Sequence, residues 1–491
     1  MTRQTLTPLV LFILFFTGMA VIQFSTPHMP DNDGFYHIKF AWLMRTEGLK
    51  PDFPYLPMSI LNGEDFYDHH FLYHVALIPF TFGDLRLGAK WAAVTFSALA
   101  FTAVWYLLHR QKVPYAWLWA LALLGISEAF LYRMSISRAQ SLSLGIMALG
   151  LAWMFEGKYK HLAVVSFLYV WMYNAFPLMI LLAGCYTGAV YLLEKRFDPR
   201  PLLYSSVGIF AGLVFNPYFP NNLIFTYHHF IAKLELAESI KVGNEWYPYD
   251  TGQLLNNSLP ALLAFTGGAL ALGLTGRRMT TRTATTLFAA LIFGAMLFQA
   301  RRFIEYFPPF ALIFAAFSWA SMFDFDNSLL MRLTTKKQAS PFSIVLSLAI
   351  LAGMVKAFPA VQAQLADSKP YDLYEGSSAW LAQNTNEGEI IFQTDWDDFP
   401  RLFFYNSRNT YLAGLDPTYF QIYSPDLYRE WVKITRGEVE NPSRFIRSDF
   451  GARFVHTDLN HGNFIEQAQD DPGLREVYRD GQSVLFEVIE P

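Results

Sequence analysis

Apolar runs long enough to cross a lipid bilayer recur along the chain and limit its fold more than any other feature. Crossing takes about 20 apolar residues, and a helix can cross because it satisfies its own backbone hydrogen bonds. Charged residues make up only 16% of the chain, against roughly 25% in soluble domains. We count eleven candidate spans, at residues 7–26, 88–108, 115–132, 139–155, 161–175, 177–193, 201–217, 259–276, 284–300, 303–322 and 342–358. The sequence therefore predicts a polytopic α-helical membrane protein.

Lysines and arginines between these runs predict the orientation of the chain, because short cytoplasmic loops carry an excess of both residues. Arg3 and the run at 7–26 are similar to a signal peptide, but the run is long and no small-x-small cleavage site follows it. We therefore expect a retained anchor with its N-terminus in the cytoplasm. The basic loops that then become cytoplasmic contain Arg110 and Lys112; Lys158 and Lys160; Lys195, Arg196 and Arg200; Arg277, Arg278 and Arg282; and Arg332, Lys336 and Lys337. This scheme requires the apolar segment at 71–82, which is too short to span, to stay at the outer surface.

The first outer loop, at residues 27–87, collects ionisable side chains at one face of the membrane. These side chains are Asp31, Asp33, His37, Asp52, Glu64, Asp65, Asp68, His69, His70 and His74. Aromatic residues alternate with them, whereas a freely solvated loop is polar throughout and rich in Gly and Ser. We therefore expect short helices on the membrane surface that hold a polar cleft. The alternative interpretation is a solvated polar loop.

Composition counts against several classes of function. The predicted spans contain almost no Asp, Glu, Lys or Arg, whereas ion pumps and proton-coupled transporters place such residues at mid-depth. The net charge is −4 and no basic stripe is present, so nothing favours nucleic acid as a partner. The single cysteine, Cys185, excludes an internal disulfide framework and a cysteine metal site.

A second domain follows the last apolar run, where residues 359–491 take on the composition of a soluble domain of ordinary size. Residues 1–358 form the membrane domain in this division. Strand-like segments lie at 388–394, 409–415, 452–458 and 483–489, and helical segments at 377–385 and 424–435. Asp480-Gly481 predicts a hairpin turn. We expect a small α/β domain on the outer side of the membrane.

Carboxylates of the first outer loop are the candidates for acid–base or metal chemistry. Asp33 could act as a general base on an acceptor, or its oxygens could hold a divalent cation such as Mg²⁺ or Mn²⁺. Asp68, with His69 and His70, could complete such a site from the far end of the loop.

Two further pairs of residues in the outer loops are candidates for substrate binding. Arg301 and Arg302 begin a span on the outer side, where guanidinium groups can grip a lipid phosphate with two hydrogen bonds. The alternative is that these arginines only anchor the helix at the interface. Glu245 and Trp246 place a carboxylate beside an aromatic surface, which suits sugar recognition.

The most specific motif in the chain is NDGFYH, at residues 32–37. It resembles the first-loop aspartate motif of the GT-C superfamily of integral-membrane glycosyltransferases, and the chain is most similar to the catalytic subunit of oligosaccharyltransferases. The resemblance implies that Asp33 is the catalytic carboxylate near metal and acceptor, with Asp31, His37 and residues 68–70 around it.

Other segments resemble the same superfamily. Residues 68–74 and 83–87 lie where aminoarabinose and protein mannosyl transferases carry a histidine-rich juxtamembrane helix and a Leu-Arg-Leu step. Ile136-Ser137-Arg138 is similar to the opening of the second-loop motif, but Ala139-Gln140 then replaces the acidic metal-binding pair of the family. This change either removes metal dependence or moves the missing ligand to another carboxylate; the candidates are Asp68, Glu64 and Glu245.

The second domain also carries a partial match. Residues 395–399, DWDDF, stand where oligosaccharyltransferases carry Trp-Trp-Asp-Tyr-Gly, the pocket that reads the acceptor sequon. Trp396 and Asp397 match that motif and are candidate substrate contacts. The other positions differ, so transfer to asparagine sequons is not implied.

Together these features predict a glycosyltransferase that takes a sugar from a polyprenyl-phosphate carrier at the outer face. Asp33, Asp31, His37 and Asp68 are the expected catalytic residues, with Asp33 and Asp68 as the expected ligands of any divalent cation. The donor phosphate would be held by Arg301, Arg302 and Arg138. The resemblance implies a bacterial inner membrane, with the second domain in the periplasm. Two alternatives stay open: an oligosaccharyltransferase acting on protein, and a flippase or transporter of lipid-linked glycans.

The orientation can be tested by cysteine labelling. With Cys185 replaced by alanine, a cysteine introduced at Arg110 should react with a membrane-impermeant maleimide only after the cytoplasmic side is opened, because segment 71–82 does not cross. Labelling from the outside in intact cells would show that this segment spans and that the scheme is wrong.

Overall fold

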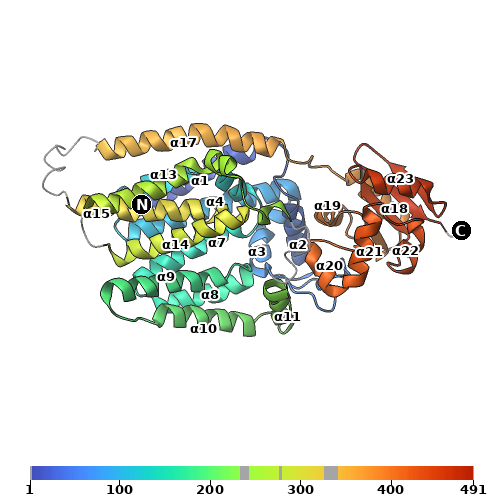
Figure 1. The fold of residues 1–491 in the computed structure, drawn as a ribbon, viewed down its shortest axis with the longest axis horizontal. Coiled ribbons are helices and arrows are strands. Elements are labelled where there is room, and N and C mark those ends of the chain that lie inside the picture. The colour runs from blue at the N-terminus through green and yellow to red at the C-terminus, as the bar shows by residue number, and fades with distance from the viewer. Residues whose placement is uncertain (1–2, 233–242, 276–278, 326–340, 490–491) are drawn as a thin grey trace.

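A bundle of long helices carries a small α/β domain at one end in the computed structural model (Figure 1). The structure describes residues 3–232, 243–275, 279–325 and 341–489. Five basic residues used to predict the orientation, Arg277, Arg278, Arg332, Lys336 and Lys337, lie outside the described residues.

Helices dominate the first part of the chain. The longer ones are α1 (Arg3–Gln23), α4 (Leu85–Arg110), α7 (Gln140–Phe155), α8 (Tyr159–Met172), α9 (Pro177–Glu194), α10 (Arg200–Val214), α13 (Thr251–Thr275), α14 (Thr281–Gln299), α15 (Phe307–Phe325) and α17 (Pro341–Ala366). Within the described ranges, six helices are long and apolar enough to cross a membrane: Leu85–Arg110, Pro177–Glu194, Thr251–Leu274, Thr281–Gln299, Arg301–Ala320 and Pro341–Ala366. A polytopic helical fold is therefore confirmed, but the predicted count of eleven spans is not.

The apolar run at 115–132 does not form one continuous helix. It forms α5 (Ala116–Leu121) and a short 3₁₀ helix (Ala122–Leu124), and a new helix, α6 (Glu128–Ser135), begins after Ser127. The Ser127 side chain accepts a hydrogen bond from the Phe130 amide and so caps α6. At the break, a Cβ on Gly125 would lie 2.9 Å from the Gly353 carbonyl carbon, so this residue lets α17 approach the backbone closely.

The first outer loop is folded rather than freely solvated, and it includes short helices. It contains α2 (Asp33–Glu47), α3 (Phe71–Leu77) and the 3₁₀ helix η1 (Ile78–Thr81). The last two occupy the segment predicted not to span, and each is far too short to cross. Asp84 then caps α4 by accepting hydrogen bonds from the amides of Arg86 and Leu87 at 2.8 and 3.1 Å.

The second domain has a five-stranded mixed sheet of order β2-β1-β3-β5-β4. Its strands are β1 (Ile390–Gln393), β2 (Thr410–Tyr411), β3 (Phe454–Asp458), β4 (Leu474–Arg479) and β5 (Ser483–Val488). β1 pairs in parallel with β2 and β3, whereas β5 pairs antiparallel with β3 and β4. The four predicted strands and the hairpin at Asp480-Gly481 are confirmed.

Helices surround this sheet and include both of those predicted. They are α18 (Glu375–Asn384), α19 (Phe399–Tyr405), α20 (Pro417–Tyr423), α21 (Pro425–Thr435), α22 (Pro442–Ser448) and α23 (Gly462–Asp470). In Figure 1, α19 and α20 lie on the side of the domain that faces α2. The predicted boundary at 359 falls inside α17, which continues to Ala366.

An aromatic cluster joins the first outer loop to the second domain. Phe53 stacks on Phe66 with ring centroids 4.3 Å apart, and the Tyr55 ring lies 4.7 Å from that of Phe403. The Tyr411 amide donates a hydrogen bond of 2.9 Å to the Tyr55 carbonyl. The loop is therefore held between the bundle and the second domain, and this packing fixes the position of α2.

Truncating the centre of this cluster should loosen the junction. Phe53 is 1% exposed, so Phe53→Ala should reduce the free energy of unfolding by about 3–5 kcal/mol, as expected for a buried phenylalanine. Thermal unfolding in detergent and tryptic release of the second domain would measure the effect. Phe197→Ala, at a side chain that is 64% exposed, is the matched control. Equal behaviour of the two variants would contradict a structural role for the cluster.

Candidate active site

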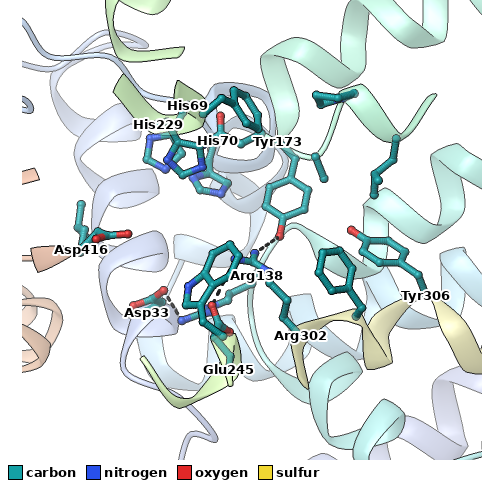
Figure 2. Close-up of a pocket in the computed structure, with 18 of the residues that line it drawn as sticks. Asp33, His69, His70, Arg138, Tyr173, His229, Glu245, Arg302, Tyr306 and Asp416 are labelled. Carbon is teal, nitrogen blue, oxygen red and sulfur yellow. Dashed lines mark hydrogen bonds and ion pairs between the residues drawn. The ribbon is translucent and has the colours of Figure 1, made fainter. Parts of the chain in front are cut away.

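A cavity of about 300 Å³ opens where the loop at residues 27–87, the ends of bundle helices near the second domain and the second domain itself meet. Its polar lining consists of Asp33, His37, His69, His70, Arg138, Tyr173, Asn174, His229, Glu245, Trp246, Arg302, Tyr306 and Asp416. Its apolar lining consists of Ala175, Pro177, Leu178, Phe230, Met296, Phe303 and Leu415. Figure 2 shows the histidines gathered on one side of the cavity and the charged groups on another.

Asp33 is the first residue of α2, and its carboxylate enters the cavity beside Arg138 (Figure 2). The Arg138 guanidinium forms ion pairs with Asp33 and, at 2.9 Å, with Asp31. Burial raises the pKa of Asp33 to about 7, although the positive charge of Arg138 opposes this rise. A carboxylate with a pKa near neutrality is suited to act as a general base.

Glu245 lies in a short 3₁₀ helix, η4 (Asn244–Trp246), and receives three guanidinium groups. Its carboxylate is 2.8 Å from Arg133, 3.5 Å from Arg138 and 3.6 Å from Arg302. These positive charges hold the pKa of Glu245 well below its usual range, although burial acts in the opposite direction. Glu245 is therefore ionised and links three separate segments of the chain.

Arg302, rather than Arg301, enters the cavity. Arg302 stacks on the Trp246 ring at 4.2 Å and donates a hydrogen bond of 3.3 Å to the Tyr173 hydroxyl. Arg301 donates to the Pro248 carbonyl at 3.1 Å and contributes to a different cavity.

Glu305 pairs with Arg133 rather than with Arg301, which precedes it by four residues. Both Arg301 and Glu305 lie in the 3₁₀ helix η5 (Arg301–Glu305), in which residues three apart, not four apart, share a face. Glu305 is 1% exposed and accepts a hydrogen bond of 2.7 Å from Arg133 Nε instead. Glu305 therefore orients Arg133 and not Arg301.

Two histidines of the first outer loop, His37 and His74, form a series of hydrogen bonds that ends at Asp68. His74 Nδ1 is 2.8 Å from the Asp68 carboxylate, and His74 Nε2 is 2.8 Å from His37 Nδ1. Burial lowers the pKa of His69 to about 4 and lowers those of His37 and His70 well below the usual value. These three histidines are therefore neutral rings at neutral pH. Asp68 is 1% exposed and lies behind the cavity lining.

The expected metal pair, Asp33 and Asp68, is not brought together. Asp33 forms an ion pair with Arg138, whereas Asp68 accepts from His74. Among the residues that the structure describes, no group of three or more His, Cys, Asp or Glu side chains is arranged to hold a metal ion. The described side chains therefore do not fit a divalent cation at this site, because guanidinium and imidazole groups already neutralise or bind both carboxylates.

Trp396 and Asp397 do not line the cavity. Asp397 accepts a hydrogen bond of 2.7 Å from the Asn32 side chain, and Trp396 packs against the core of the second domain. The Asn32 side-chain oxygen accepts from Arg401 at 2.7 Å. These contacts attach the second domain to the residue that precedes Asp33, so Asp397 positions the start of α2.

Several lining residues were absent from the sequence-based candidates. Asp416 reaches the cavity from the second domain, and Tyr173, His229 and Tyr306 come from three different parts of the bundle (Figure 2). A signal existed for His229, which is polar and lies in the predicted outer loop at 217–258. Tyr173 and Tyr306 lie inside the predicted spans at 161–175 and 303–322 and had no such signal.

No family model and no curated protein sequence matches the chain. Solved structures do match it in fold. The Archaeoglobus fulgidus oligosaccharyltransferase in the apo form is 13% identical, with a TM-score of 0.67 over 94% of this chain and 71% of that chain. The same enzyme, named AglB, has been solved with an inhibitory peptide and a dolichol-phosphate, and also with Zn and sulfate.

Two other structures extend the comparison. ArnT from Cupriavidus metallidurans, bound to undecaprenyl phosphate, is 14% identical, with a TM-score of 0.58 over 98% of this chain and 97% of that chain. Arabinofuranosyltransferase AftD from Mycobacteria is 14% identical, with a TM-score of 0.57 over 100% of this chain and 40% of that chain. The predicted resemblance to GT-C membrane glycosyltransferases is therefore confirmed at the level of the fold.

Proposed function

We propose that this protein is a glycosyltransferase that moves a sugar from a polyprenyl-phosphate carrier to an acceptor at the outer face of a membrane. The observation that carries the proposal is that a carboxylate, Asp33, and a guanidinium group, Arg302, line the same cavity. Sugar transfer from a phosphate needs a base for the acceptor and a positive group for the leaving phosphate. The matched structures include a complex with undecaprenyl phosphate and one with a dolichol-phosphate, which supports a carrier of this class.

Arg302 is the group we assign to the donor phosphate. Trp246 covers one face of its guanidinium group and the Tyr173 hydroxyl binds one edge, so the side chain is held in place before a ligand arrives. A guanidinium group has five N–H donors in a fixed plane, which leaves donors for a phosphate. Arg138, the other expected phosphate ligand, already contacts three carboxylates.

The apolar part of the lining suits the lipid of such a donor. Pro177 and Leu178 at the start of α9, Met296 near the end of α14 and Phe303 in η5 lie in the same cavity as Arg302. Isoprene units next to the phosphate can pack on these side chains, while the sugar faces the polar groups. The apolar part of the cavity therefore suits the lipid of the donor, and the polar part suits its sugar.

The reaction consists of one displacement at the anomeric carbon of the sugar. The acceptor oxygen or nitrogen forms a bond to this carbon as the bond to the phosphate oxygen breaks. Asp33 takes the proton of the acceptor, and the polyprenyl phosphate leaves with its charge held by Arg302. A base with a pKa near 7 matches this task at neutral pH.

A transporter is less well supported than an enzyme. The charged side chains gather at the end of the bundle that carries the second domain, and Leu415 and Asp416 of that domain line the cavity. Ion pumps typically place charged side chains halfway along their membrane spans, which is not where the charged side chains of this site lie. We further propose a bacterial inner membrane as the location, with the N-terminus in the cytoplasm and the second domain in the periplasm.

Removing the proposed base should slow transfer severely. The assay is release of polyprenyl phosphate from a panel of polyprenyl-phosphate hexoses and pentoses, with acceptors from membrane extracts. Asp33→Asn should lower release by about 100-fold or more, because general-base catalysis contributes about 10²–10⁴. Wild-type release should also fall as the pH drops below 7, as Asp33 becomes protonated, and the Asn variant should lose this dependence. Near-normal release by a folded Asn variant would remove Asp33 from the mechanism.

The two neighbouring arginines provide a matched pair for the phosphate site. Arg302→Lys should weaken binding of undecaprenyl phosphate by about tenfold or more, because lysine keeps the charge but cannot form the planar, two-donor contact. Arg301→Lys should leave binding unchanged, since Arg301 contacts the Pro248 carbonyl outside the cavity. Calorimetric titration in detergent would measure both. Weaker binding by the Arg301 variant alone would place the phosphate in the neighbouring cavity.

A further inference from the structure

One guanidinium group lies among three carboxylates at the wall of the cavity. The NH2 group of Arg138 contacts Asp33 and lies 2.9 Å from Asp31, and its NH1 group lies 3.5 Å from Glu245. Figure 2 shows Arg138 between Asp33 and Glu245. These carboxylates come from two outer loops that are more than 200 residues apart in the sequence, so a single cation joins them.

The segment that follows Arg138 offers no acidic ligand. Ala139 is fully buried, and the Gln140 side chain donates a hydrogen bond of 2.7 Å to the Arg133 carbonyl. Of the three carboxylates considered as a replacement ligand, Glu64 is exposed and Asp68 binds His74. Only Glu245, of the three, contacts Arg138 within the described part of the chain.

We propose that Arg138 takes the place of a divalent cation: it is a positioning residue whose guanidinium group neutralises and orients Asp33 and Glu245, so that the site works without a bound metal ion. The mechanistic part of this proposal rests on the proposed function. The part that concerns cation binding does not, and it is tested separately.

The chemistry of a divalent metal ion and of a guanidinium group explains how the second can replace the first. Mg²⁺ and Mn²⁺ bind carboxylate oxygens at short distances in a near-octahedral shell, and they dissociate. A guanidinium group always carries its charge and directs several N–H donors in one plane, so it can bridge carboxylates that approach from different sides. Because it is covalently attached, it cannot be removed by a chelator.

The proposal predicts a gain of metal binding when the guanidinium group is removed. Arg138→Ala leaves Asp31 and Asp33 without their cation, beside Glu245, which keeps its contacts with Arg133 and Arg302. Groups of carboxylates of this kind bind divalent ions through their oxygen atoms. We expect the full-length protein in detergent to bind Mn²⁺ at least about tenfold more tightly after this substitution, because uncompensated carboxylates favour a nearby positive charge. Electron paramagnetic resonance of added Mn²⁺ would measure free and bound ion.

Three control variants make the result specific. Arg138→Lys keeps the positive charge and should bind Mn²⁺ no better than the wild type. Arg138→Ala combined with Asp33→Asn removes one of the proposed ligands and should lose the gained binding. Arg301→Ala removes an arginine outside the cavity and should behave like the wild type.

Two outcomes would overturn the proposal. The first is stoichiometric Mn²⁺ or Zn²⁺ binding by the wild type that is lost in an Asp33→Asn variant whose unfolding temperature is near that of the wild type. The second is an Arg138→Ala variant that remains monodisperse, unfolds at a temperature near that of the wild type and gains no Mn²⁺ binding.

Catalysis provides a separate check. Wild-type release of polyprenyl phosphate should be unchanged by excess EDTA and by added Mn²⁺ or Mg²⁺. Loss of release in EDTA with recovery on adding the metal would overturn the proposal while leaving the proposed function intact. Absence of release under every condition, with every donor, would instead count against the proposed function.

Discussion

Ion pairs between arginines and carboxylates at the end of the bundle that carries the second domain organise the rest of the site. Arg133 and Arg138, from one short stretch of the chain, and Arg302, from another, all contact Glu245. Arg133 also pairs with the buried carboxylate of Glu305, and breaking a buried pair by removing one partner costs about 3–5 kcal/mol, because the other charge is left without compensation. The segments that carry these residues are therefore held in one arrangement, and the charges of Asp33 and Arg302 face the same cavity as a consequence.

The second domain completes this arrangement from the other side. Arg401 and Asp397 bind the side chain of Asn32, directly before Asp33, and the aromatic cluster around Phe53 fixes the remainder of the loop. The domain also contributes Asp416 to the cavity lining. Its contribution to the site is thus both structural and direct, which the partial sequence motif at 395–399 did not indicate.

Local patterns predicted a large part of the fold. Alternating apolar residues and a turn signal were sufficient for the strands of the second domain, and the NDGFYH motif identified Asp33. The count of spans is not confirmed, and at residues 115–132 a capping serine and a close approach at Gly125 interrupt the apolar run. Apolar content reports burial but not the point at which a helix ends.

The arrangement of the candidate site depended on contacts that sequence patterns do not contain. Arg133 lies at the end of an apolar run, and nothing local shows that it pairs with Glu245 and Glu305. The choice between Arg301 and Arg302 required the geometry of a 3₁₀ helix, and the separation of Asp33 from Asp68 required the hydrogen bonds of the two histidines. Each of these is a long-range pairing or a local geometry that a single sequence does not specify.

In the proposed reaction, Asp33 takes the proton of the acceptor while Arg302 holds the phosphate that leaves the anomeric carbon. A structure of the Asp33→Asn variant with an intact polyprenyl-phosphate sugar would test this claim most directly. The account predicts the donor phosphate within hydrogen-bond distance of Arg302, with the anomeric carbon of the sugar turned toward residue 33. A phosphate bound instead at Arg301, or a sugar directed away from residue 33, would contradict it.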